Sequence, residues 1–414
     1  MVGSGGREHA LAAVLGRTAE VVVTPGNPGI PHSVASAPED LEADLFVIGP
    51  EAPLVDGLAD RLRAKGRLVF GPGAEGARLE GSKAWMKRLL SEAGVPTARH
   101  RCFTELEAAT RFLKELAPPY VVKADGLAAG KGVLVTASFD EAVDDVERKL
   151  SGAAFGPAGT TVVVEEGLRG PELSVLAVCD GERAVPLAPA QDFKRAGDGD
   201  TGPNTGGMGA YSPVPLSGAE VCEQVMDRAV EPTLHALRER GVDYRGVLYA
   251  GLMLTADGPK VLEYNVRFGD PEAQVVLPRL ESDLTDLLAQ AAGGRLRSEP
   301  RFDPRACVAV VAASEGYPER PRTGDPIAGI DEAAASEDVD VFCAGVGRDG
   351  QGRLVTAGGR VLDVCGYGPT IPVARHRAYA AVGKLHWPGV WFRRDIAAGV
   401  GGASPPDSKE EAGR

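Results

Sequence analysis

The chain has 414 residues, of which 43% are hydrophobic and 25% are charged. This composition is typical of a globular protein in water, and the length predicts two to four domains. A formal net charge of −13, from 45 basic and 58 acidic residues, argues against a nucleic-acid-binding surface. The six cysteines lack C-x-x-C pairs, no apolar run reaches membrane-spanning length and no signal-peptide pattern opens the chain. We therefore expect a cytoplasmic protein with reduced thiols.

Short apolar runs alternate with stretches of helical spacing in the first part of the chain. The runs predict buried parallel strands, each ending in a Gly- or Pro-rich turn, at 21–24, 45–49 and 68–70. Helices are expected at 9–15 and 54–64, between these strands. The alternation predicts a doubly wound parallel α/β domain at the N-terminus.

The pattern changes after a predicted helix at 80–93. The next strands are expected at 120–123, 132–135, 160–166 and 173–179, with a later hairpin of 246–254 and 260–265. Helices are expected at 140–150, 220–240 and 282–292. Residues 191–211 look like a polar, Gly-rich loop, and loops of that length are usually functional or disordered.

From about residue 301 the pattern becomes β-rich. Strands are expected at 307–313, 339–343 and 360–365, and a helix at 371–385. Residues 401–414 form a low-complexity polar tail, which we expect to be disordered.

The strand at 260–265 carries the clearest candidate site. Because side chains alternate along a strand, Glu263 and Asn265 share one face. A carboxylate beside an amide oxygen suits a hard cation such as Mg²⁺, which takes few protein ligands. Arg267 lies two residues further on and can hold a phosphoryl group or a carboxylate. An exposed strand edge would explain the Glu-x-Asn pair alone, but the charged turn Phe-Gly-Asp-Pro-Glu after it favours a binding site.

A Gly-rich connection follows the strand that ends in Lys123. It is one residue too short for a P-loop, and a strand rather than a helix comes after it. It is better explained as the tip of an antiparallel hairpin whose backbone N–H groups fold over phosphates, with Lys123 placed to reach them. A plain flexible hairpin is the alternative.

Gly-rich turns also follow the N-terminal strands. The turn at 3–6 opens a helix whose free N–H groups can bind a phosphate. Glu8 stands where a dinucleotide fingerprint needs glycine, which disfavours NAD(P). Asn27 and Glu51 follow later strands at the same expected edge of the sheet, unless their segments are only tight turns. Four glycines at 201–211 suggest a loop that brings its backbone close to a ligand, or else a mobile surface loop.

In chain order these motifs resemble the glycinamide ribonucleotide synthetase (phosphoribosylamine–glycine ligase) family of the ATP-grasp superfamily. The resemblance covers nearly the whole chain: GSGGREHAL, PGNPG, GPEAPLV, LEGSKAWMK, KADGLAAGKGV, GDTGPNTGGMGAYSP and NVRFGDPEAQ. It implies an N-terminal substrate domain (1–79), a two-lobed ATP-grasp domain (80–300) with a small lid lobe at about 102–170, and a C-terminal domain (301–400). The implied reaction joins glycine to 5-phosphoribosylamine through glycyl phosphate, giving glycinamide ribonucleotide, ADP and phosphate.

The resemblance also implies the site residues, position by position. Arg267, Lys123 and Asp192 would be catalytic, and Glu263 and Asn265 would hold Mg²⁺ or Mn²⁺. ATP would lie against Lys83, Lys123, Gly126, Gly130, Lys131 and Gly132, with Glu165, Glu166 and Glu172 near its adenine and ribose. Phosphoribosylamine would meet Gly6, Arg7, Glu8, Asn27 and Glu51, and glycine would meet Asp192, Gly206, Gly207, Met208 and Gly209.

The chain departs from the family in three places. Only Met1 and Val2 precede the first glycine motif. Either the start codon is misassigned or the first strand is shortened, which should weaken the substrate domain. Residues 37–43 are shorter than the corresponding helix of the family, and the strand at 246–254 supplies no additional metal carboxylate.

Two other functions fit part of the sequence. One is a purine-pathway carboxylating or formylating ligase, which TGPNTGGMGAYSP disfavours. The other is a nucleotide-binding oxidoreductase or regulatory module built on the turn at 3–6. The expected partners are the small molecules ATP, glycine and phosphoribosylamine, with neither nucleic acid nor membrane, and we expect a monomer.

Overall fold

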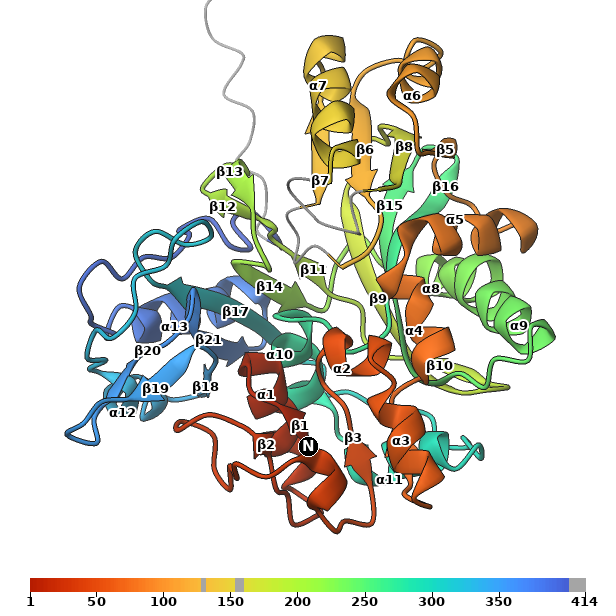
Figure 1. The fold of residues 1–414 in the computed structure, drawn as a ribbon. Helices are drawn as coiled ribbons and strands as arrows, with labels where there is room; N and C mark the ends of the chain where they lie inside the picture. Colours follow the sequence, from red (N-terminus) through yellow and green to blue (C-terminus); the bar gives the residue numbers. More distant parts are fainter. Residues whose placement is uncertain (128–131, 153–159, 402–414) are drawn as a thin grey trace, which may run out of the picture.

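The computed structural model describes residues 1–127, 132–152 and 160–401. In Figure 1 the N-terminal part lies at the bottom, a small lobe projects at the top and the C-terminal part lies at the left. Gly130, Lys131 and nearly all of the expected polar tail fall outside the described residues. None of the helices in the described ranges is long and apolar enough to cross a membrane.

The N-terminal part is built on four short parallel strands. They are β1 (Val2–Gly3), β2 (Thr24–Pro25), β3 (Phe46–Val47) and β4 (Val69–Phe70). β1 pairs with β2 and β3 with β4, while a parallel bridge from Val2 to Ile48 joins the two pairs. The order β2-β1-β3-β4, with helices between the strands, confirms the doubly wound parallel α/β prediction.

Three helices accompany these strands: α1 (Gly6–Leu15), α2 (Glu51–Val55) and α3 (Leu58–Ala64). The helix expected at 54–64 is therefore wrong as a single element. It breaks at Gly57, whose φ of 76° is left-handed and cannot continue a right-handed helix. A 3₁₀ turn at Pro38–Asp40 occupies the short segment at 37–43.

The helix expected at 80–93 is also two helices, α4 (Ala74–Gly81) and α5 (Lys83–Glu92). The chain is extended at Ser82, whose side chain accepts a hydrogen bond from the Trp85 amide at 3.1 Å. This is an N-cap, and it starts a new helix because serine satisfies an amide that the first turn leaves unpaired.

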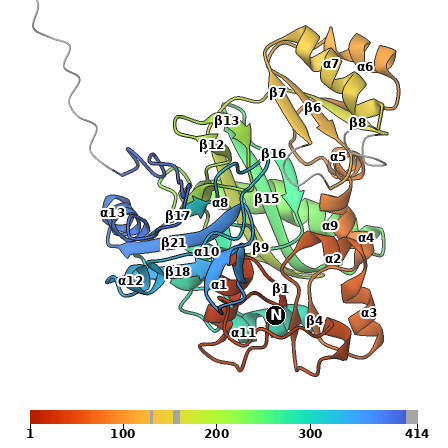
Figure 2. The ribbon, with the colours of Figure 1, turned by 60° about the vertical axis from the view of Figure 1, so that its left-hand side comes forward.

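The small lobe is an antiparallel sheet of order β5-β8-β6-β7, with two helices packed against it (Figure 2). Its elements are β5 (His100–Phe103), α6 (Leu106–Leu113), β6 (Tyr120–Ala124), β7 (Val133–Thr136), α7 (Phe139–Leu150) and β8 (Val162–Glu166). Tyr120 pairs with Thr136 and Lys123 with Val133, which confirms the predicted hairpin.

The larger lobe contains a second antiparallel sheet of order β10-β9-β15-β16. Its strands are β9 (Glu172–Asp180), β10 (Ala184–Pro186), β15 (Arg245–Thr255) and β16 (Gly258–Asn265). The helix predicted at 220–240 is confirmed as α8 (Ala219–Val225), a π-helical segment (Met226–Val230) and α9 (Glu231–Glu239) in unbroken succession. A further helix, α11 (Leu284–Ala292), packs against β9 and β15.

The C-terminal part has a five-stranded sheet of order β11-β14-β17-β21-β18. Three strands come from the end of the chain: β17 (Ala306–Ala313), β18 (Val339–Cys343) and β21 (Arg360–Gly368). The other two, β11 (Gln191–Asp192) and β14 (Gly209–Ser212), come from the segment expected to be a loop. That expectation is wrong, because β14 gains its hydrogen-bonded partner from β17, about one hundred residues later.

The remaining elements surround this sheet. They are the hairpin β12 (Arg195–Gly197) and β13 (Thr201–Asn204), α10 (Glu272–Val276), a 3₁₀ turn (Leu277–Arg279), α12 (Ile330–Ala334), the hairpin β19 (Val346–Arg348) and β20 (Leu354–Thr356), and α13 (Ile371–Val382). β17 is buried along its whole length, as expected of a central strand covered on both faces.

Candidate active site

Arg267, just beyond the end of β16, joins the large lobe to the N-terminal part. Its Nε lies 3.2 Å from Glu51 Oε2, while its Nη2 lies 2.9 Å from Glu80 Oε1 and donates to Asn265 Oδ1 at 3.1 Å. Burial alone would lower the pKa of Arg267, but the carboxylates of Glu80 and Glu51 outweigh burial and raise this pKa above its ordinary value. Arg267 is therefore a fixed cation at the meeting of two structural units.

The two carboxyls beside Arg267 respond differently. Burial raises the pKa of Glu80 above its ordinary range in spite of the nearby guanidinium. At Glu51 the effect of burial is outweighed by Arg267 and Arg7, which lower its pKa. Glu80 also accepts a hydrogen bond from the Val266 amide at 2.8 Å. It thereby fixes the backbone that carries Arg267.

Glu263 and Asn265 lie two residues apart on β16, opposite Gly251 and Tyr249 of β15. Asn265 accepts from Arg267, but within the described part of the chain no hydrogen bond or ion pair engages the Glu263 carboxylate. Burial would raise the pKa of Glu263, yet surrounding cations hold it below its ordinary value: Lys123, Lys194, Lys83 and Arg267. The described residues include no group of three or more His, Cys, Asp and Glu side chains that could enclose a metal. An ionised carboxylate and one amide oxygen do fit a cation that shares its remaining positions with phosphate and water.

A buried ion-pair cluster lies beside this strand, between the two lobes. Glu165 on β8 has Lys123 Nζ 3.0 Å from Oε1 and Lys87 Nζ 3.0 Å from Oε2. The three side chains are at most 6% exposed. Burial would raise the pKa of Glu165, but the two lysines hold it below its ordinary value, while burial lowers the pKa of Lys87 to about 8. Lys123 also donates to the Leu262 carbonyl at 3.0 Å, which ties the small lobe to β16.

Lys83 opens α5 at the root of the predicted lid hairpin. Its Nζ donates to the Gly126 carbonyl at 3.0 Å. Burial lowers its pKa, an effect that the Glu263 carboxylate opposes. Lys83 thus belongs to the same charged region as Glu263.

A second acidic group surrounds Lys194. Its ammonium pairs with Glu172, and with Asp192 Oδ1 at 3.0 Å. Burial raises the pKa of Asp192 to about 7, with Lys194 opposing and the carboxylates of Glu272 and Glu172 adding to the rise. Glu272 is buried and accepts from the Tyr249 hydroxyl. Asp192 is therefore poised to change charge near neutrality.

The first turn of α1 packs tightly against the neighbouring strand ends. Glu8 accepts from the Gly5 amide at 2.6 Å and pairs with Arg7 Nε at 2.6 Å, and both side chains are buried. A Cβ on Gly49 would lie 2.2 Å from Glu8 Oε1, so that position requires glycine. Arg7 Nη1 also donates to the Phe268 carbonyl at 3.2 Å, which brings α1 to the segment that follows Arg267.

The glycine segment before β14 is held by the C-terminal part. Arg360 Nη1 donates to the carbonyls of Gly206 and Asp270, each at 2.8 Å, and Nη2 lies 3.1 Å from the Asp270 carboxylate. The Gly206 amide donates to the Tyr317 hydroxyl at 3.0 Å. Met208 is fully buried, and a Cβ on Gly207 would lie 2.5 Å from Pro271. These contacts place the segment beside the turn that follows Arg267.

The Asn27 amide is engaged by backbone alone. Its Nδ2 donates to the carbonyls of Ser4, Cys343 and Ala344 at 2.8, 3.2 and 3.0 Å, and its Oδ1 accepts from the Gly29 amide at 2.8 Å. Asn27 thereby holds the turn after β1 against the C-terminal part.

The structure brings most of the expected residues together around β16 and α1. Sequence reasoning missed four residues that hold them: Glu80, Lys87, Lys194 and Arg360. Lys87 did carry a signal, since it lies between Met86 and Leu90 on the buried face of α5, where a lysine needs a partner. Glu166 lies at the edge of the cluster and accepts from the Arg99 amide at 2.9 Å.

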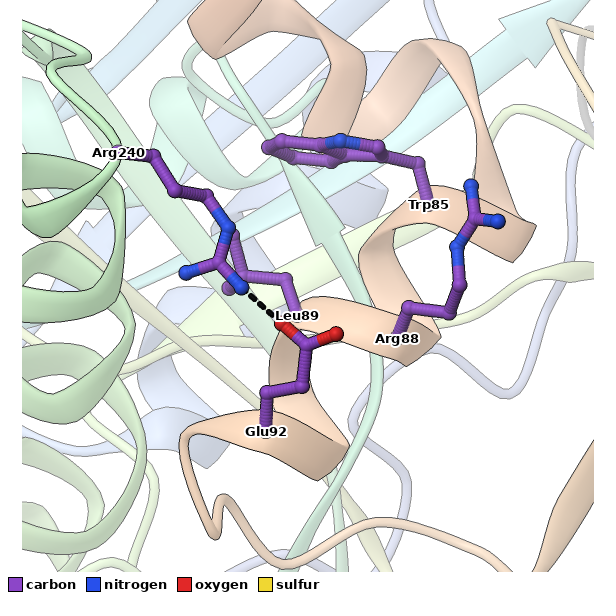
Figure 3. A pocket seen from close by; sticks show the side chains of 5 residues that line it. All are labelled: Trp85, Arg88, Leu89, Glu92 and Arg240. Carbon is purple, nitrogen blue, oxygen red and sulfur yellow. Dashed lines mark hydrogen bonds and ion pairs between the residues drawn. The ribbon is translucent and has the colours of Figure 1, made fainter.

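A surface hollow elsewhere shares no residue with this site. It has a volume of about 320 Å³ and is lined by Trp85, Arg88, Leu89, Glu92 and Arg240. Figure 3 shows the Glu92–Arg240 ion pair across it, below the Trp85 ring. Arg88 and Glu92 are exposed, and the hollow lies between α5 and the end of α9.

The two antiparallel sheets, with lysines between them and an acid–amide pair at a strand end, define an ATP-grasp enzyme. Solved structures agree on the fold: the MgADP complex of the biotin carboxylase domain of 2-oxoglutarate carboxylase from Hydrogenobacter thermophilus has a TM-score of 0.70 at 17% identity, covering 94% of this chain and 90% of that one. The chain belongs to the phosphoribosylglycinamide synthetase family, whose N, ATP-grasp (A) and C domain profiles match residues 1–80, 81–273 and 307–399.

Full-length relatives support this membership. The chain is 49% identical to a phosphoribosylamine–glycine ligase of Xanthomonas axonopodis pv. citri, over 96% of each chain. It is 48% identical to one of Rhizobium meliloti, over 96% of this chain and 97% of that one. The crystal structure of the Thermotoga maritima ligase superposes with a TM-score of 0.85 at 38% identity, covering 96% of this chain and 99% of the other.

Proposed function

We propose that this chain joins glycine to 5-phosphoribosylamine in two steps. The glycine carboxylate attacks the γ-phosphate of ATP, giving glycyl phosphate and ADP, and the amine then attacks the acyl carbon and releases phosphate as glycinamide ribonucleotide forms. The observation that carries the proposal is Arg267, which contacts Glu51 of the N-terminal part on one side and Asn265 of the ATP-grasp sheet on the other. A cation at that junction can stabilise the negative charge of the phosphoryl group while it passes from ATP to the glycine carboxylate.

Glu263 and Asn265 would hold the divalent cation, Mg²⁺ or Mn²⁺. Such a cation neutralises charge on the transferring phosphate. The Glu263 carboxylate is kept ionised by the cations around it, and no side chain of the described residues competes for it. ATP is the co-substrate.

Lys83 and Lys123 would contact the ATP phosphates, since both reach the space between the lid hairpin and β16. Gly126 and Gly132, at the two ends of this connection, would lie near the phosphates. The sequence assigns Gly130 and Lys131 to the same role, but they fall outside the described residues. Glu165, Glu166 and Glu172 lie at the junction of the two lobes, and we assign them to the adenine and ribose side. Glu165 would act indirectly, because both its oxygens already face lysines.

The sugar-phosphate amine would bind at the start of α1, where the first amide groups have no acceptor within the helix. The residues there are Gly6, Arg7, Glu8, Asn27 and Glu51, with Asn27 acting through the turn that it holds. Glycine and the acyl phosphate would lie by Asp192 and the segment of Gly206, Gly207, Met208 and Gly209. With its pKa near 7, Asp192 is suited to accept the proton that the attacking amine loses.

We assign these roles to units at 1–79, 80–300, with a lid lobe at about 102–170, and 301–400. We further propose a monomer that acts on small molecules in the cytoplasm.

The test is ADP release by the purified protein with each substrate omitted in turn. The proposal expects ADP only when both glycine and phosphoribosylamine are present, and release with another amino acid but not glycine would refute it. Tight NADH binding without ATP binding would instead favour the oxidoreductase alternative.

A further inference from the structure

Asp363 of β21 is a buried carboxyl that the proposed reaction does not use. It is 1% exposed, and its Oδ2 accepts from Gln274 Nε2 at 2.8 Å. Its Oδ1 is buried, and no donor or acceptor within the described residues reaches it. A buried polar atom with no partner is costly, so this carboxyl calls for an explanation.

The carboxyl lies directly against the start of α1. A Cβ on Gly6 would lie 1.9 Å from Asp363 Oδ2 and 3.0 Å from Gln274 Nε2. Glycine is therefore required at residue 6 by the approach of Asp363 from the C-terminal part. Gln274 also donates to Asp270 Oδ1 at 2.8 Å, so one amide connects Asp363 to the turn after Arg267.

The charged neighbours do not neutralise Asp363. Arg360 pairs with Asp270 instead, since Arg360 Nη2 lies 3.1 Å from Asp270 Oδ2. Arg7 on α1 pairs with Glu8 and donates to the Phe268 carbonyl. Burial raises the pKa of Asp363 to about 7, with the Asp270 carboxylate adding to the rise and Arg360 opposing it. Among the described residues, the Asp363 charge also acts on two thiols whose pKa is raised by burial, Cys343 on β18 and Cys365 on β21.

We propose that Asp363 is a positioning residue for the anionic group of the amine substrate. As a neutral acid it holds Gln274 against α1 and leaves the positive end of that helix to the substrate. As a carboxylate it places a negative charge at the same helix end and competes with the substrate for it. The inference rests on the proposed function, which assigns the start of α1 to the sugar phosphate.

The expected effect follows from Coulomb's law. Two unit charges about 8 Å apart, at an effective dielectric constant of about 20 to 40, repel enough to weaken binding about 5- to 30-fold. Between pH 6 and pH 8.5 the KM for phosphoribosylamine should therefore rise relative to that of a variant that cannot ionise at residue 363, whereas the KM for ATP should show no such difference.

The variant to compare is Asp363→Asn, which keeps the shape and the acceptor of the neutral acid but cannot ionise. Its ratio of KM for phosphoribosylamine at pH 8.5 to that at pH 6 should fall well below the wild-type ratio. Asp349→Asn is the matched control, because Asp349 makes its contacts with Arg353 and its own turn in the β19–β20 hairpin. Identical pH profiles of wild type and Asp363→Asn would overturn the proposal.

A binding measurement separates this inference from the proposed reaction. Calorimetric titration with ribose 5-phosphate, at pH 6 and pH 8.5, needs no turnover. The phosphate's own ionisation is common to both proteins and cancels in the comparison. At pH 8.5 Asp363→Asn should therefore bind ribose 5-phosphate more tightly than the wild type does. An equal pH dependence of the two affinities would refute the role of Asp363 even if ligase activity is found. Conversely, a protein that shows the shift but makes no glycinamide ribonucleotide would refute the reaction alone.

Discussion

Replacing Glu263 with glutamine tests the cation site most directly. The change keeps the size of the side chain but removes the only carboxylate of the pair on β16. Glu263 has no partner among the described residues, so its replacement should weaken binding of the cation and leave the stability of the fold unchanged. Removing one group that stabilises charge in a transition state costs about 3 kcal/mol, so turnover should fall about 100- to 1,000-fold. The assay is glycine- and phosphoribosylamine-dependent ADP release over a range of Mg²⁺ concentrations.

The control is Asp257→Asn on the same hairpin. Asp257 lies in the turn between β15 and β16, its side chain is 82% exposed and its ion pair is with Lys260. This variant should turn over as the wild type does, and both variants should keep the wild-type unfolding temperature to within a few degrees. Near-normal turnover of Glu263→Gln at low Mg²⁺ would refute the assignment of Glu263 to the cation.

Three further changes test the groups around this site. Arg267→Lys should lower kcat about 100-fold in steady-state ADP release, because one ammonium cannot replace a planar fork that bonds on several sides; a change confined to KM would contradict this. Glu165→Leu leaves Lys87 and Lys123 buried without their counter-ion, so urea denaturation should show a loss of about 3–5 kcal/mol, and an unchanged midpoint would refute the ion-pair account. Burial lowers the pKa of His9 to about 4 from an ordinary 6.5, so the unfolded chain takes up a proton that the folded chain does not, and stability should be lost as the pH falls from about 6.5 to about 4. His9→Asn should show a smaller decrease in thermal stability over that range, and an equal decrease would count against the neutral buried ring.

Regular periodicity accounts for what could be predicted of the fold. The apolar runs at 45–49 and 68–70 pair in parallel because each has hydrophobic residues for both faces of a covered strand. The prediction failed at 191–211 because this segment is polar and Gly-rich as a whole, and the short run Gly209–Ser212 becomes a strand only beside β17. It failed again at Ser82 and Gly57, where one residue's capping or backbone preference divides an otherwise helical pattern.

The candidate site was predictable to the extent that its residues share one strand. Alternation along β16 was enough to place Glu263 and Asn265 together, and Arg267 followed from its position two residues on. Glu80 and Arg360 were not predictable in this way, because they reach the site from a helix and from a strand more than ninety residues further along the chain. Asp363 has no motif at all, and its significance depends on a distance to Gly6 that no local pattern encodes.

The five-stranded sheet limits how far this chain can be divided. Because β14 is hydrogen-bonded to β17, cutting the chain near residue 300 would strip a central strand of its partner and leave an unpaired edge in the remaining fragment. Exchange of the last hundred residues with those of a relative would have to preserve that register, whereas the small lobe forms a sheet of its own strands and can be exchanged with less disturbance. The last boundary between the family domains, between residues 273 and 307, thus divides the sequence where the folded molecule is held together by a shared sheet. Recombination between relatives should therefore succeed more often at the borders of the small lobe than at this boundary.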